Sequence, residues 1–178
     1  MKPLRTFLMG IVFVLGLAGL TFAQTTANQT VTMQISAISV LGVSGNPAAL
    51  IVTAPALAGD LPANPTSNTT YARYTSTVAT GVTRRLQANW AVLDAAPAGC
   101  SLLLTATPAG LPNQGSSAGQ ITMTSTATNI VTGIGSCATG MGATSGAQLT
   151  YLLSVDTMTA LVAGDNHVVT ITLTLTDN

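Results

Sequence analysis

The C-terminal part of the chain has the most regular alternation of apolar and polar residues. Between Val169 and Thr176, the apolar residues Val169, Ile171, Leu173 and Leu175 alternate with four threonines. Side chains of a β-strand point to opposite faces with period two, so this pattern predicts a half-buried strand with an apolar inner face. Threonine is β-branched and favours an extended backbone, which supports the same prediction.

A second alternating stretch lies near the N-terminus. Residues Thr30–Ser36 place Val31, Met33 and Ile35 on one face, and the stretch continues into residues 38–41 after a bulge or bend that shifts the alternation. The sequence leaves two interpretations of this stretch open. It is either the first strand of the chain's own fold, or a donor strand that completes the sheet of another subunit.

Several short stretches between these two also have strand patterns, separated by turn residues. They cover residues 49–53, 70–78, 83–93, 100–107, 120–126, 129–134 and 147–155. The second and third are expected to form a hairpin around Gly81, with Leu86, Ala88, Trp90 and Val92 facing inward. No long stretch has helical periodicity, so the pattern predicts an all-β fold, an antiparallel β-sandwich.

The first 23 residues have the organisation of a signal peptide. Lys2 and Arg5 precede an apolar run that ends at Leu20, and Ala23 offers a cleavage site. The apolar run is shorter than the about 20 residues that span a membrane. We therefore expect a cleaved leader at 1–23, an N-terminal extension at 24–36 and a β-sandwich domain at 37–178. The mature chain is expected to be extracellular, with no membrane contact.

The predicted mature chain has very few charged residues. It holds three arginines and five aspartates, which gives a net charge of −2. Ordinary soluble domains carry about 25% charged residues. Such a surface offers no basic patch for nucleic acid or anionic lipid. A low charge favours association, and it suits a subunit that is mostly covered by copies of itself.

Cys100 and Cys137 are the only cysteines of the chain. Export would place them where disulfides persist, and no histidine lies near them in sequence to complete a metal site. We therefore expect a structural disulfide between Cys100 and Cys137. Closing that loop would stabilise the fold by roughly 4 kcal/mol on the chain-entropy model.

The residue types that enzymes use are scarce. His167 is the only histidine, and the aspartates are scattered among turns without a paired-carboxylate spacing. We therefore expect no catalytic residue, no cofactor and no metal site. Arg84 and Arg85 form the densest charge of the mature chain, and we interpret them as the solvated start of a strand.

Two functional hypotheses remain. The first is a structural subunit of an extracellular filament or surface layer, assembled by β-strand complementation through the N-terminal stretch. The alternative is a monomeric secreted adhesin or carbohydrate-binding module that uses Tyr71, Tyr74 and the Pro55–Ser67 loop. Trp90 and Tyr151 fall on inward faces and are expected in the core.

The leader, the low charge, the alternating N-terminal stretch, the cysteine pair and the closing strand Val168–Thr176 together resemble bacterial pilin-type and spore-coat-U-type secreted domains. The resemblance extends over the mature chain and lies in its composition and its alternation, not in a diagnostic motif. The chain differs from chaperone–usher pilins at its end, because those tend to close with an aromatic residue. The resemblance implies an immunoglobulin-like fold and a structural, extracellular role.

The subunit contacts expected under the first hypothesis lie in the two alternating stretches. The donor side chains are Val31, Met33 and Ile35, and those of the closing strand are Val169, Ile171, Leu173 and Leu175. The expected partners are further copies of this chain and an assembly factor.

Overall fold

The computed structural model describes residues 28–93 and 95–178, so the predicted leader lies outside the described residues. Regular structure in the described part of the chain is β-strand, apart from one 3₁₀ turn, η1 (Met158–Ala160). The fold is therefore all-β, as the alternation predicts. The strands are β1 (Ile38–Val43), β2 (Thr66–Thr77), β3 (Arg84–Trp90), β4 (Cys100–Thr107), β5 (Gln114–Ser117), β6 (Gln120–Thr122), β7 (Thr128–Ile134), β8 (Cys137–Ala138), β9 (Ala147–Val155) and β10 (Ile171–Asp177).

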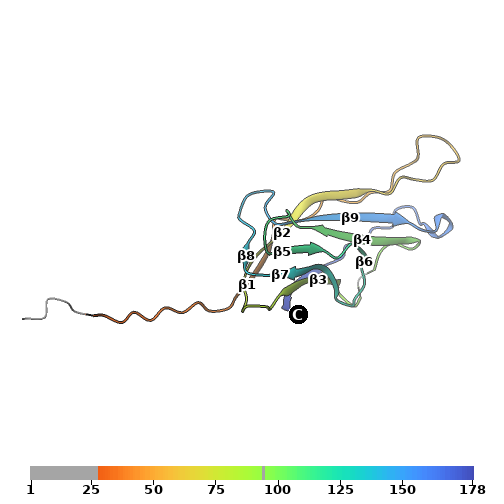
Figure 1. Ribbon diagram of the computed structural model, residues 1–178. Coiled ribbons are helices and arrows are strands. Elements are labelled where there is room, and N and C mark those ends of the chain that lie inside the picture. The colour runs from red at the N-terminus through yellow and green to blue at the C-terminus, as the bar shows by residue number, and fades with distance from the viewer. Residues whose placement is uncertain (1–27, 94) are drawn as a thin grey trace, which may run out of the picture. The chain divides into compact units, whose positions relative to one another are not determined.

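The strands form two antiparallel sheets (Figure 1). The first has the order β1-β2-β9-β4-β6, with β8 also paired to β2, and the second has the order β10-β3-β7-β5. The predicted hairpin between residues 70–78 and 83–93 is wrong, because β2 and β3 belong to different sheets. The turn at Gly81 leads the chain from one sheet to the other instead of reversing it within one sheet.

One hydrophobic core joins the inner faces of both sheets. The alternating faces expected from sequence are seen in β2, where Ala72 and Tyr74 are buried, and in β3, where Leu86 and Ala88 are buried. Val92 is exposed, contrary to expectation, because β3 ends at Trp90. The remaining core residues are Leu102, Leu104, Ala106, Met123, Ile130, Val131, Ile134, Ala147, Leu149 and Tyr151.

The two alternating stretches differ in structure. The closing strand forms as predicted but begins at Ile171, and Val169, Ile171, Leu173 and Leu175 are all half-buried against the core. Residues 30–36 form no strand. The first strand of the fold is β1, so the interpretation of residues 30–36 as that strand is wrong.

The expected disulfide is also wrong, because Cys100 and Cys137 are both free thiols. Cys100 lies opposite Val155 in β9, whereas Cys137 lies opposite Ser76 in β2. The register pair Ala72–Ala147 links those two strands. Val155 lies eight residues from Ala147 along β9, and Ser76 lies four residues from Ala72 along β2, in the opposite direction from that register pair. The two cysteines are therefore about 40 Å apart along the sheet, at ~3.3 Å per residue. A disulfide requires Cα atoms within about 7 Å.

Candidate functional site

A largely apolar groove lies between two sheet edges. One side is formed by Val43 and the segment 45–51 that follows β1, and the other by residues 165–171 and Leu173. The groove has a volume of about 770 Å³. β1 and β10 are edge strands of the first and the second sheet, and Val43 of β1 and Ile171 and Leu173 of β10 line the groove.

The floor of the groove is made of core side chains from both sheets. Leu102, Leu149, Tyr151 and Leu153 come from β4 and β9 of the first sheet, and Trp90 comes from the end of β3 in the second. Burial raises the pKa of the Tyr151 phenol. The phenol therefore stays uncharged at neutral pH, and these five residues present a neutral, largely apolar surface.

The backbone at the rim of the groove is suited to strand addition. β10 pairs with β3 through the whole register from Ile171–Trp90 to Asp177–Arg84. On its other side, the described strands offer β10 no partner. An edge strand of this kind presents a row of backbone groups that another extended segment can pair with.

A histidine positions the rim segment that precedes β10. The Nε2 atom of His167 lies 3.0 Å from an Asp165 carboxylate oxygen, and its Nδ1 atom lies 3.0 Å from the carbonyl oxygen of Ala95. The contact with Ala95 holds the 165–168 segment beside the loop that follows β3, and the contact with Asp165 lies within the segment and orients the imidazole ring. His167 therefore has a structural role at the rim, four residues before β10 begins at Ile171.

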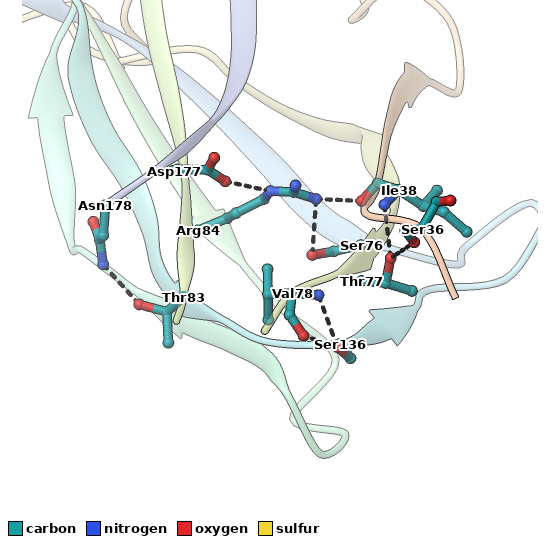
Figure 2. Close-up of polar contacts among 10 residues, drawn as sticks. All are labelled: Ser36, Ile38, Ser76, Thr77, Val78, Thr83, Arg84, Ser136, Asp177 and Asn178. Atoms are coloured by element: carbon teal, nitrogen blue, oxygen red, sulfur yellow. Dashed lines mark hydrogen bonds and ion pairs between the residues drawn. The ribbon is translucent and has the colours of Figure 1, made fainter. Parts of the chain in front are cut away.

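The groove is lined by the end of β1 and the beginning of β10. The opposite ends of these two strands are joined by polar contacts at what we call the tied end, defined by Ile38, Ser76, Thr77, Arg84 and Asp177 (Figure 2). Arg84 donates from Nε to the Asp177 carboxylate at 2.6 Å and from Nη1 to the hydroxyl of Ser76 at 3.4 Å. The same Nη1 donates to the carbonyl oxygen of Ile38. One guanidinium thus joins the beginning of β1, the end of β2, the beginning of β3 and the end of β10.

The burial of Arg84 corrects the expectation of a solvated strand start, since the residue is only 6% exposed. The sequence does carry a signal for this. Leu86, Ala88 and Trp90 were assigned to the inner face, and one further step of two residues places Arg84 on that face as well. Its partner Asp177 keeps a largely exposed side chain, so the ion pair is buried on one side only.

The aromatic residues of the alternative binding-module hypothesis do not gather on the surface. Tyr74 is 2% exposed, and its hydroxyl donates to the carbonyl oxygen of Gln114 at 2.6 Å. Tyr71 is half-buried and lies 3.3 Å from the Gln148 amide. Tyr151 is in the core as expected, while Trp90 is half-buried and lines the groove.

Other chemistry is sparse in the part of the chain that the structure describes. No three His, Cys, Asp or Glu side chains among those residues lie close enough together to hold a metal ion. Asp156 accepts hydrogen bonds from the hydroxyls of Ser101 and Ser154, which lower the pKa of its carboxyl group. No helix of the described chain is both long and apolar enough to cross a membrane.

The predicted donor side chains are the most accessible apolar groups of the described N-terminal stretch. Val31 is 67% exposed, Met33 88% and Ile35 87%. The sequence predicts these residues and those of the closing strand as subunit contacts, and that assignment stays a prediction. Sequence reasoning missed the groove itself, because residues 43–51 and 165–170 meet only through the pairing of strands that are distant in sequence. Searches against protein-family models, curated proteins and solved structures found no match to this chain.

Proposed function

We propose that this chain is a structural subunit of an extracellular filament or surface layer, in which the N-terminal segment of one subunit fills the groove of the next. Under this proposal, the two sheets of a single subunit form an immunoglobulin-like sandwich that lacks one strand beside β10. The observation that carries the proposal is that one chain has both an apolar groove between two edge strands and an alternating segment whose apolar side chains are exposed.

The segment and the groove are matched in length. The rim beside β10 extends from Val168 to Leu173, five residues apart, which is about 17 Å at ~3.3 Å per residue. Val31 and Ile35 are four residues apart, about 13 Å in an extended strand. Three inward side chains therefore fit within the groove, with Thr30, Thr32 and Gln34 facing outward.

The chemistry of the two surfaces is also matched. Val31, Met33 and Ile35 are apolar, and the floor of the groove is neutral and largely apolar. Burying three such side chains contributes roughly 5–9 kcal/mol before the cost of ordering the segment is subtracted. Backbone hydrogen bonds to the edge of β10 with which no described strand pairs would add directionality, as in other cases of strand addition. The low charge of the mature chain supports close packing between copies.

Electron microscopy with size-exclusion chromatography tests this proposal on purified protein that begins at Gln24. We expect fibres or large oligomers, and we expect a synthetic peptide of residues 24–37 to inhibit their formation by occupying the groove. The control peptide carries serine in place of Val31, Met33 and Ile35, and should not inhibit. A protein that stays monomeric over a wide concentration range and binds neither peptide would overturn the proposal.

A further inference from the structure

The proposed function raises a question of competition. A segment joined to its own domain by a short flexible linker reaches an effective concentration on the order of 1 mM. At about 10 μM protein, the chain's own segment would then occupy the groove about a hundredfold more often than the segment of another copy. A subunit that polymerises through this groove needs a feature that prevents this self-insertion.

We propose that the tied end prevents self-insertion, so that the occupant of the groove is the N-terminal segment of a second copy. This inference rests on the proposed function and identifies the partner at the same site. To enter its own groove, the chain would have to reverse direction just before Ile38. It would then run back between β1 and β10, from the tied end toward the open part of the groove.

The first obstacle is Arg84. Its guanidinium bridges the Ile38 carbonyl oxygen of β1 and the Asp177 carboxylate of β10, and it also contacts the Ser76 hydroxyl (Figure 2). The two edge strands are therefore connected where a returning segment would have to pass between them. Because Arg84 is 6% exposed, displacing it would leave buried hydrogen-bonding groups without partners, which is costly.

The second obstacle is the anchoring of the backbone before β1. The Thr77 hydroxyl donates to the carbonyl oxygen of Ser36 at 2.9 Å and accepts from the backbone N–H of Ile38 at 2.6 Å. Thr77 also lies opposite Ile38 in the β1–β2 register. One side chain of β2 thus holds the residues on both sides of Ala37, and this contact fixes the direction in which the chain enters β1.

The third obstacle is turn chemistry. A two-residue hairpin turn requires positive φ at one or both central residues, which favours glycine, asparagine or aspartate. The residues before Ile38 are Ser36 and Ala37. Neither has a positive φ, since Asn113 is the one non-glycine residue with this conformation in the described chain. The local sequence therefore gives no support to a reversal at this point.

The test removes these obstacles in two ways on protein that begins at Gln24. Arg84→Gln removes the guanidinium bridge. The second variant, which we call the open variant, adds Thr77→Val, Ser36→Asn and Ala37→Gly to Arg84→Gln. It also removes the Thr77 contacts and supplies a hairpin turn, so none of the three obstacles remains. Urea unfolding of Arg84→Gln alone shows how far that change weakens the fold. Thr75→Val is the matched control, since it makes the same change two residues earlier on the same face of β2.

The expected result is self-insertion in the open variant. At about 10 μM, its polymer yield should fall about a hundredfold relative to wild type. Its melting temperature should rise above that of Arg84→Gln alone, become independent of protein concentration and no longer respond to the peptide of residues 24–37. The control should assemble like wild type. An open variant that assembles like wild type and still binds the peptide would overturn the inference while leaving the proposed function intact. A wild-type protein that neither assembles nor binds the peptide overturns both.

Discussion

The N-terminal stretch Thr30–Ser36 and the closing strand β10 have the same alternation of apolar and polar residues, yet only one of them is a strand. In β10, Ile171, Leu173 and Leu175 pack against the core, and the backbone pairs with β3 along its whole length. In the N-terminal stretch, Met33 and Ile35 are each almost 90% exposed.

The difference shows that alternation specifies a strand only where a partner edge is available. Each strand of the fold has at least one neighbour, and β10 uses β3. The N-terminal stretch has an alternating sequence but pairs with no strand of the described chain. The groove beside β10 offers a strand edge, but no described strand fills it. Under the proposed function, these two incomplete surfaces complete each other between copies.

The largest effect is expected from making the N-terminal stretch polar. Serine at Val31, Met33 and Ile35 removes about 4 kcal/mol or more of apolar burial at the contact, about a thousandfold in the association constant. The fold of the monomer should be unchanged, because these side chains are exposed in it. Sedimentation measures the assembly, and serine at Thr30, Thr32 and Gln34 is the control. Equal assembly of both variants would show that the inward face of the stretch is not used.

A smaller effect is expected from one matched pair of alanine substitutions. Leu173→Ala in β10 should lower the free energy of unfolding by about 2 kcal/mol, the low end for leucine because the side chain is half-buried. Met33→Ala should change it by less than about 0.5 kcal/mol. Urea unfolding of the monomer at low concentration measures both. A comparable loss in the two variants would mean that the N-terminal stretch packs on its own domain.

The smallest effect is expected from reducing agents. With Cys100 and Cys137 as free thiols, dithiothreitol should not shift the urea midpoint, whereas a disulfide would contribute roughly 4 kcal/mol. Burial raises the pKa of both thiols, so alkylation near pH 8 should be slower than for an exposed cysteine. Mass spectrometry after alkylation in denaturant should count two modified cysteines. An unmodified pair would contradict the structure.

Much of the fold could be predicted from sequence because alternation is a local signal. The inward positions of β2, β3 and β9 follow from period two alone. The partners of each strand do not, which is why the β2–β3 hairpin and the Cys100–Cys137 bond were predicted wrongly. β5 was missed because its sequence, Gln114-Gly115-Ser116-Ser117, is typical of a loop.

The geometry of β5 explains why a residue typical of loops stands within a strand. Gly115 has a φ of 81°, and a Cβ there would lie 2.5 Å from the carbonyl oxygen of Thr132 in β7. The close approach of the two strands therefore requires glycine. Only part of the candidate site could be predicted from sequence. Its apolar side chains follow from alternation, but the role of Arg84 depends on four strand ends that meet only in the folded domain.

The central claim is that Met33 of one copy lies in the groove of another, and photo-crosslinking tests it most directly. A photoreactive phenylalanine analogue replaces Met33 in unlabelled protein, which is mixed with nitrogen-15-labelled wild type, assembled and irradiated. We predict crosslinks between unlabelled and labelled copies, with the modified residues of the labelled copy among Trp90, Leu149, Tyr151 and Leu173. Crosslinks within unlabelled copies alone, or crosslinks to residues on the outer faces of the sheets, would contradict the account.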